Sequence, residues 1–151
     1  MLSNSRQRII LLVGLPGSGK STWLQQQGIS GLSSDAVRLL LSDDETDQTI
    51  HRRVFATLRY LLKQRLAIGK PVTCVDATHL TAWERRPYLK LAEVYNASVE
   101  AVFFDVPLEV CRERNQRRNR VVPEDVLQRM AAKLVPPTTV EGFSRVTVVR
   151  D

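Results

Sequence analysis

Short apolar runs alternate along the chain with longer segments in which apolar residues recur every three or four positions. The runs short enough to be strands cover residues 8–13, 29–33, 72–75, 99–104 and 146–149, and the second of them is the weakest. Strands that alternate with helices are joined by right-handed crossovers, so neighbouring strands run parallel. The pattern therefore predicts an α/β fold, a three-layer sandwich around a mostly parallel five-stranded sheet.

Segments with helical spacing lie between these runs and predict the longer helices. The first covers about 47–68 and ends before Gly69 and Pro71. The second includes residues 88–95, and the third follows Pro123. The apolar positions that define the first helix are Ile50, Val54, Leu58 and Leu61.

The sequence allows two possibilities for the start of the second helix. Thr81 and Glu84 have the spacing of a capping box, which would place Pro87 inside the helix. Proline has no N–H to donate, and its ring collides with the preceding turn. The helix is therefore expected either to begin later or to kink.

Length and charge limit what the chain can be. With 151 residues, 43% of them hydrophobic, it can form one domain, residues 1–151, and has no room for a second domain of ordinary size. Its formal charge of +6 favours an anionic partner such as a polynucleotide, although solubility alone can explain such an excess.

The cysteines and the apolar runs bear on location. Cys74 and Cys111 are isolated, which predicts buried, reduced thiols. Residues 6–15 imitate a signal peptide, but no small-residue cleavage site follows them. No apolar stretch approaches the roughly 20 residues that span a bilayer. A cytoplasmic protein without membrane association is expected.

The most specific motif follows the first apolar run directly. Residues 14–22 read Gly-Leu-Pro-Gly-Ser-Gly-Lys-Ser-Thr, a phosphate-binding loop. Its glycines let backbone N–H groups point at phosphate oxygens, and the following helix adds its N-terminal amides. Lys20 can reach the β and γ phosphates of a nucleoside triphosphate, and Ser21 can bind Mg²⁺. The expected nucleotide-binding residues are Gly14, Pro16, Gly17, Ser18, Gly19, Lys20, Ser21 and Thr22.

Ligands of such sheets bind beyond the carboxyl ends of the strands, where the second run is followed by Asp35 and Arg38. Three residues apart, these side chains share one face of a helix. Phosphoryl transfer needs a carboxylate that accepts the proton of the acceptor hydroxyl and a cation that holds the acceptor. Asp35 and Arg38 fit those roles. Alternatively, Asp35 or Ser34 only caps a helix and Arg38 is solvated.

Asp76 and Thr78 follow the third run. A carboxylate at this point can help to hold Mg²⁺ through water or can bind acceptor or loop groups. His79 is expected to be a loop residue and no metal ligand, because no second histidine or carboxylate stands at ligand spacing. Asp105, after the fourth run, is expected at the entry of a helix.

Residues 112–120 contain five arginines. Arg114 and Arg118 are one helical turn apart and could close over the triphosphate as a lid. An arginine on the transferring phosphoryl group can be worth about a thousandfold in rate. The alternatives are a solvated basic helix end and the attraction of a nucleic-acid backbone.

Two further features are expected to be structural. Trp23, Trp83 and Phe143 could stack on a base, but packing is the expected role of each. The acidic stretch at 42–47 is expected to cap the long helix and to stay solvated.

Together these motifs resemble the kinase domain of 5′-hydroxyl polynucleotide kinases, which are the phage and bacterial end-healing enzymes and the kinase half of the animal polynucleotide kinase/phosphatase. The resemblance runs from about residue 8 to 149, and residues 136–143 are similar to the segment that closes the animal-type domain. The motifs that carry it are the phosphate loop, Asp35-x-x-Arg38, Asp76-x-Thr78, Phe104-Asp-Val-Pro107, and Arg114 with Arg118.

The resemblance implies that Asp35 is the general base, Arg38 holds an acceptor phosphate and Arg118 contacts the donor phosphates. It also implies that Asp76 and Thr78 belong to a loop near the acceptor, which in the family reads Asp-x-Thr-Asn. Two positions depart from the family pattern: the last asparagine of that loop is His79 here, and Ser34 stands where some relatives have a basic residue.

The function indicated is an ATP- and Mg²⁺-dependent transfer of the γ-phosphoryl group to a hydroxyl. The favoured acceptor is the 5′-hydroxyl of a single-stranded or end-bearing nucleic acid. A small-metabolite kinase of the same fold is one alternative, and a non-catalytic nucleotide-binding or ATPase switch module is another. The chain has no Asn-Lys-x-Asp guanine signature, and a switch would have no evident use for Asp35 and Arg38.

Overall fold

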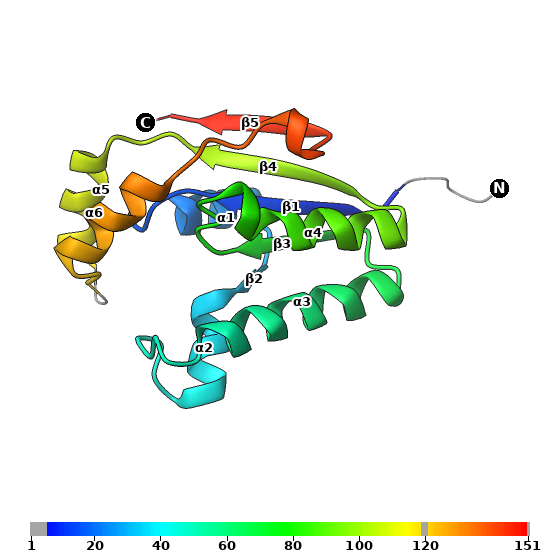
Figure 1. Ribbon diagram of the computed structural model, residues 1–151, viewed down its shortest axis with the longest axis horizontal. Coiled ribbons are helices and arrows are strands. Elements are labelled where there is room, and N and C mark those ends of the chain that lie inside the picture. Colours follow the sequence, from blue (N-terminus) through cyan, green and yellow to red (C-terminus); the bar gives the residue numbers. More distant parts are fainter. Residues whose placement is uncertain (1–5, 119–120, 151) are drawn as a thin grey trace.

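Five parallel strands form the central sheet of the computed structural model, which describes residues 6–118 and 121–150 (Figure 1). The order of the strands is β2-β3-β1-β4-β5, and each of the four pairings is parallel. The strands are β1 (Arg8–Val13), β2 (Gly31–Ser33), β3 (Val72–Asp76), β4 (Ser98–Phe104) and β5 (Arg145–Val149). The predicted α/β class is confirmed, and the weak second run is a three-residue edge strand.

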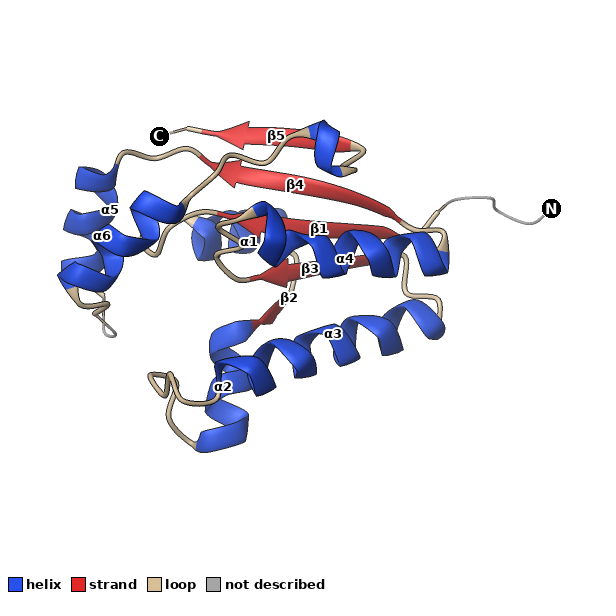
Figure 2. Cartoon of the chain, in the orientation of Figure 1, coloured by secondary structure: helices blue, strands red, loops and turns tan. Residues whose placement is uncertain are grey.

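Helices follow each of the first four strands (Figure 2). The helices α5 and α6 follow one another without a strand between them and lie together beyond the carboxyl ends of the strands. The bounds of the helices are α1 (Lys20–Gln27), α2 (Ser34–Ser42), α3 (His51–Ala67), α4 (Ala82–Tyr95), α5 (Leu108–Gln116), α6 (Glu124–Lys133) and the short 3-10 helix η1 (Thr139–Glu141).

The side chains of β1 alternate between two hydrophobic clusters, as successive residues of a strand must. Ile9 and Leu11 belong to the cluster that the buried faces of α3 and α4 complete. Ile10 and Leu12 point to the opposite face and pack with Leu24 of α1. The sheet therefore lies between α1 on one side and α3 with α4 on the other, and β1 is buried from both sides.

The long helix α3 buries one stripe of residues four positions apart: Val54, Leu58, Leu62 and Leu66 are each at most 3% exposed. The helix begins later than the periodicity predicted, because the acidic stretch before it forms its own turns. Asp44 and Asp47 accept hydrogen bonds from Thr46 and Thr49, and the residue at the helix N-cap is Ile50. The prediction that residues 42–47 cap this helix was wrong.

The helix α4 begins at its capping residue despite the proline inside it. Thr81 Oγ1 accepts a hydrogen bond from the backbone N–H of Glu84 at 3.2 Å, and Pro87 lies within the helix. The later start is therefore excluded. The cap and the burial of Arg85 and Tyr88 hold the first turn in place although Pro87 donates no hydrogen bond.

Two predictions about burial and membranes can be compared with the described residues. Cys74 and Cys111 are buried and form no disulfide, as expected. Within residues 6–118 and 121–150, no helix combines the length and the apolar character that a membrane span requires.

Candidate active site

A cavity of about 550 Å³ opens beyond the carboxyl ends of the strands. It brings together most of the predicted site residues, although they come from four separate segments of the chain. Of those residues, Gly14 and Arg38 do not line the cavity. The ones that do are Pro16, Gly17, Ser18, Gly19, Lys20, Ser21, Thr22, Asp35, Asp76, Thr78, Arg114 and Arg118.

The glycines of the phosphate loop are required by geometry. Gly17 and Gly19 have φ angles of 82° and 100°, which side chains rarely tolerate. A Cβ atom at Gly14 would lie 2.7 Å from Ser18 Oγ, and one at Gly17 would lie 2.7 Å from the carbonyl oxygen of Cys111. The loop can keep this close turn only without side chains at these positions.

Lys20 begins α1, and its ammonium donates hydrogen bonds to the carbonyl oxygens of Gly14 and Leu15 at 2.9 and 2.8 Å. Burial lowers the pKa of Lys20 to about 8, while the charge of Asp76 acts in the opposite direction. A triphosphate in the cavity would raise this pKa again, because a nearby negative charge favours the ammonium form. The lysine is therefore positioned to contact phosphate.

Asp35 lies in the first turn of α2, and the cap of this helix is Ser33, whose Oγ accepts from the N–H of Ala36 at 3.2 Å. The alternative that Asp35 or Ser34 is the cap is therefore excluded. The carboxylate of Asp35 is 44% exposed and faces the cavity, close enough to Lys20 and Asp76 to influence their pKa values. Its position is consistent with contact to a substrate.

Arg38 lies one turn further along α2 and is only 5% exposed. The alternative of a solvated Arg38 is thus excluded. Arg38 Nη1 lies 3.4 Å from Asp35 Oδ1, and Arg38 Nε has no hydrogen-bond partner among the described residues. Because Arg38 does not line the cavity, it reaches the site through Asp35, and its predicted contact with an acceptor phosphate stays a prediction.

Asp76 ends β3 beside the phosphate loop. Burial raises the pKa of its carboxyl group, and the charge of Lys20 partly offsets this effect. Asp35 and Arg118 also act on this pKa, in opposite directions. Two carboxylates and two cations thus share one partly desolvated site, an arrangement common where enzymes tune acids and bases.

The loop after Asp76 is joined to the end of β1 by two hydrogen bonds. The carbonyl oxygen of Thr78 accepts from the N–H of Gly14 at 3.0 Å. His79 Nδ1 lies 2.6 Å from the carbonyl oxygen of Leu12, so this nitrogen carries the ring proton. His79 is a loop residue, as predicted, but it is buried and has a φ angle of 47°. These bonds fix the loop against the phosphate-binding segment.

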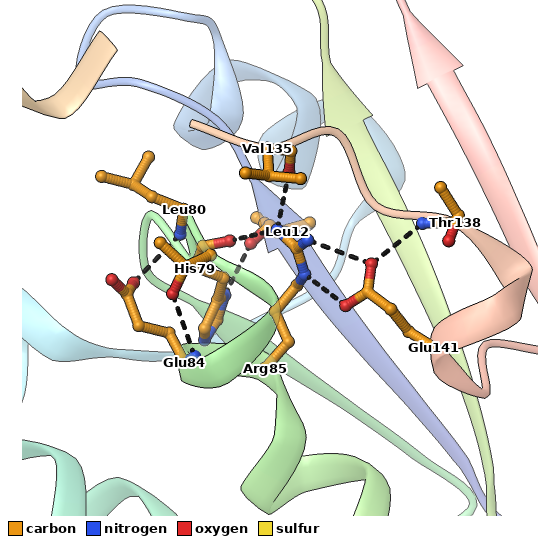
Figure 3. A network of polar contacts seen from close by, with 9 residues as sticks. Leu12, His79, Leu80, Glu84, Arg85, Val135, Thr138 and Glu141 are labelled. Atoms are coloured by element: carbon orange, nitrogen blue, oxygen red, sulfur yellow. Dashed lines mark hydrogen bonds and ion pairs between the residues drawn. The ribbon is translucent and has the colours of Figure 1, made fainter. Parts of the chain in front are cut away.

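Arg85 fastens the same loop from below (Figure 3). This side chain is fully buried and donates from Nη1 to the carbonyl oxygens of His79 and Val135, at 2.9 and 3.0 Å. Its other two nitrogens bind both carboxylate oxygens of Glu141 at 2.9 and 3.0 Å. A charge buried this deeply is stable only when it is fully paired, as it is here. Arg85 therefore ties the loop, the segment after α6 and η1 together.

Burial lowers the pKa of His79 to about 4, so the ring is neutral in the folded protein over the physiological range. An unfolded histidine binds a proton below about pH 6.5. We expect the free energy of unfolding to fall by up to about 3 kcal/mol as pH drops from 6.5 through 4, in addition to any loss that carboxylates cause. In a His79→Asn variant that extra loss should be absent.

Urea unfolding of both proteins across this pH range measures the difference. Asparagine tolerates the positive φ of this position, so the comparison does not introduce backbone strain. His51, the other histidine, is exposed and is the matched control: a His51→Asn variant should keep most of the wild-type pH dependence. Parallel curves for wild type and His79→Asn would contradict the prediction.

The arginine segment divides into two groups. Arg112 and Arg117 form ion pairs with Glu124 and Glu113, away from the cavity. Arg114 and Arg118 line the cavity beside the phosphate loop, and Arg114 Nη1 lies 3.4 Å from the carbonyl oxygen of Gly17.

The lid geometry differs from the prediction in one respect. Arg118 lies two residues beyond the end of α5 and not on it. Its backbone N–H donates a hydrogen bond to the carbonyl oxygen of Asn115. Arg118 Nη1 is buried without a hydrogen-bond partner among the described residues. Arg120, the last arginine of the run, lies outside the described residues.

The aromatic predictions have mixed outcomes. Phe143 is buried and Trp23 packs edge-on against Phe104, with ring centroids 6.0 Å apart. Trp83, in contrast, is 77% exposed, so the prediction that it packs was wrong. Asp105 does not cap a helix: α5 begins after Pro107, and Asp105 pairs with Arg150 at 3.2 Å.

Sequence reasoning missed part of the cavity wall. Phe104, Val106 and Val149 lie at or just beyond the ends of β4 and β5, where the strand-end rule could have identified them. Met130 comes from α6, and its helical spacing indicated only core packing. These residues make one side of the cavity apolar.

The donor groups in the cavity suit Mg²⁺. Ser21 supplies a hydroxyl in the first turn of α1, and Asp76 supplies a carboxylate across the cavity. Mg²⁺ usually keeps several waters and takes only one or two protein oxygens, together with substrate phosphates. Among the described residues no cluster of three histidine, cysteine or acidic side chains forms a complete cage. The residues therefore fit a metal carried in with a nucleotide.

A phosphate-binding loop after the central strand of a parallel sheet, a carboxylate beyond the next strand and arginines facing the loop define a P-loop protein of the kinase type. The AAA_33 family, described as an AAA domain, matches residues 9–137, and the chain belongs to this family. The two curated relatives described next are a kinase and a phosphatase/kinase, which supports P-loop kinase-like phosphotransfer.

Two curated relatives match nearly the whole chain. The chain is 24% identical over 138 residues to the L-seryl-tRNA(Sec) kinase of Methanococcus maripaludis. This match covers 87% of this chain and 54% of the relative. It is 23% identical over 155 residues to the bifunctional polynucleotide phosphatase/kinase of Schizosaccharomyces pombe. This match covers 97% of this chain and 34% of the relative. The chain thus spans about half and about a third of the lengths of these relatives.

Three solved structures share the fold. A candidate kinase from Chloroflexus aurantiacus has a TM-score of 0.74 at 15% identity, with 96% of this chain and 88% of that chain covered. Kti12 from Chaetomium thermophilum in complex with ADP-AlF3 has a TM-score of 0.72 at 15% identity, covering 94% and 88%. A sugar kinase from Janibacter sp. has a TM-score of 0.67 at 21% identity, covering 95% and 85%.

Proposed function

We propose that this protein transfers the γ-phosphoryl group of ATP to a hydroxyl acceptor, with the 5′-hydroxyl of a polynucleotide as the acceptor. The observation that carries the proposal is one cavity in which the phosphate loop, Asp35 and Arg118 face one another. The similarity to a polynucleotide phosphatase/kinase and the formal charge of +6 support the choice of acceptor. We further propose that the chain works as a single domain.

In the proposed reaction Asp35 accepts the proton of the acceptor hydroxyl. The acceptor oxygen then forms a bond to the γ-phosphorus while the bond from that phosphorus to the bridging oxygen of ADP breaks, and ADP leaves. Arg38 orients Asp35 through its 3.4 Å contact and is proposed to hold the acceptor. Arg114 and Arg118 would stabilise the charge on the transferring group.

Ser21 would hold Mg²⁺, with Asp76 reaching it through water, and the ion would neutralise part of the phosphate charge. Lys20 would exchange its two carbonyl partners for phosphate oxygens. Most of the acceleration is expected to come from alignment and electrostatics, with positioning worth on the order of 7 to 11 kcal/mol.

The direct test offers γ-labelled ATP together with a 5′-hydroxyl oligonucleotide, a panel of sugars and nucleosides, or no acceptor. Label should appear on the oligonucleotide and not on a matched 5′-phosphorylated one, whose 5′-hydroxyl is blocked. Label only on a small molecule would make the protein a metabolite kinase, a possibility that the likeness to a sugar kinase fold keeps open. Hydrolysis without transfer to any acceptor would support the switch alternative.

A further inference from the structure

Trp83 has no place in the core and lies in the first turn of α4 with 77% of its surface exposed. The guanidinium carbon of Arg86 lies 5.9 Å from the centroid of its ring, within the range of a cation–π contact. An exposed tryptophan that is partly covered by arginine is typical of binding surfaces, because the ring offers a large rigid face.

Basic side chains continue from this ring along the helix. Trp83, Arg86 and Lys90 stand at positions i, i+3 and i+7, which share one face of α4, and all three are exposed. An aromatic face followed by positive charges matches the chemistry of proteins that bind single-stranded nucleic acid, in which bases stack on rings and phosphates follow the cations. The positive charges of Arg86 and Lys90 disfavour a basic partner.

The first turn of α4 is fixed against the loop that enters the cavity. Glu84 accepts from the N–H of Leu80 at 3.0 Å, and Arg85 donates to the carbonyl of His79 at 2.9 Å. Thr78, at the cavity wall, is five residues from Trp83, which limits their separation to about 18 Å. A base that stacks on Trp83 therefore belongs within a few nucleotides of an end held in the cavity.

We propose that Trp83 is a stacking platform for an unpaired base of a single-stranded nucleic acid whose 5′ end occupies the cavity, with Arg86 and Lys90 facing the phosphates that follow. The proposal rests on the proposed function in one respect, the choice of a polynucleotide as acceptor. It adds that the acceptor is recognised by its bases near the end and not only by its backbone.

Intrinsic fluorescence tests the stacking directly, because the chain has only two tryptophans. Wild type, Trp83→Phe and Trp83→Ala are titrated with an oligothymidylate of about eight nucleotides and with an abasic strand carrying the same number of phosphates. Oligothymidylate should quench the wild type more strongly than Trp83→Phe, in which the remaining tryptophan is Trp23 of the cavity wall. Trp83→Phe keeps a stacking ring and should bind nearly as well. Trp83→Ala should bind oligothymidylate about 5- to 150-fold more weakly and the abasic strand unchanged.

Two further variants complete the design. Tyr60→Ala removes an aromatic ring that is 61% exposed on a different helix, α3, and should leave affinity unchanged. The double variant Arg86→Gln with Lys90→Gln should reduce the slope of log affinity against log salt by about 1.4, or about 0.7 for each lost phosphate contact.

The outcomes separate this proposal from the proposed function. Equal binding of oligothymidylate by wild type and Trp83→Ala, or equal binding of the abasic strand and oligothymidylate by wild type, would overturn the platform even if phosphate is transferred to oligonucleotides. Absence of oligonucleotide binding together with label on a small metabolite would overturn both.

Discussion

Replacing Asp35 by asparagine should lower kcat at least about a hundredfold while leaving the affinity for ATP nearly intact. The amide keeps the size of the carboxylate and can still contact Arg38, but it cannot accept a proton. The loss should therefore fall on the transfer step. Single-turnover transfer at saturating ATP, together with ATP binding measured by calorimetry, separates these two effects.

Asp105→Asn is the matched control for this change. Asp105 also follows a strand of the same sheet, but it pairs with Arg150 and does not line the cavity. Its variant should keep wild-type turnover. If Asp35→Asn keeps turnover within about threefold of wild type, Asp35 is not the base.

Replacing Arg118 by alanine should lower the transfer rate by about a thousandfold, the magnitude that a transition-state arginine supplies in related chemistry. Arg118 Nη1 is buried at the cavity without a partner in the described part of the chain, so a phosphate oxygen is the group best suited to satisfy it. The effect should appear in kcat more than in ATP affinity, because charge on the transferring group is largest in the transition state. Rapid-quench kinetics at saturating ATP measures it.

Arg117→Ala provides the comparison within the same segment. Arg117 is one residue away, 74% exposed and paired with Glu113, so its loss should change the rate by less than about threefold. A thousandfold loss in both variants would indicate that the segment matters as a fold element and not through Arg118. Equal, near-normal rates in both would remove Arg118 from the mechanism.

Much of the candidate site could be predicted from sequence because its signals are local. The phosphate loop is contiguous, and Asp35 and Asp76 follow strands directly, so the strand-end rule places them in one cavity. The burial of Arg38 had no such signal. It depends on α2 starting at Ser34, which in turn depends on a cap provided by Ser33 and not by its neighbours.

Two other features depend on contacts between residues distant in the sequence. Arg85 looked like an ordinary helix residue, but its partners lie 6, 50 and 56 residues away, which no periodicity reveals. Packing was the expected role of Trp83, because this is the commoner role of a tryptophan. Its exposure follows from the position of the Thr81 cap, which turns Arg85 inward and leaves Trp83 outside.

The hydrogen bonds that join Gly14 to Thr78 and Leu12 to His79 give the two substrate-facing loops a common support. Because β1 and β3 are adjacent parallel strands, the separation of the two loops is set by the spacing of the sheet, about 4.8 Å per strand. The two loops are therefore held in a fixed position relative to one another. The helices α5 and α6 belong to the same support, because Cys111 and Leu127 pack with Leu15 and Leu80 of the two loops.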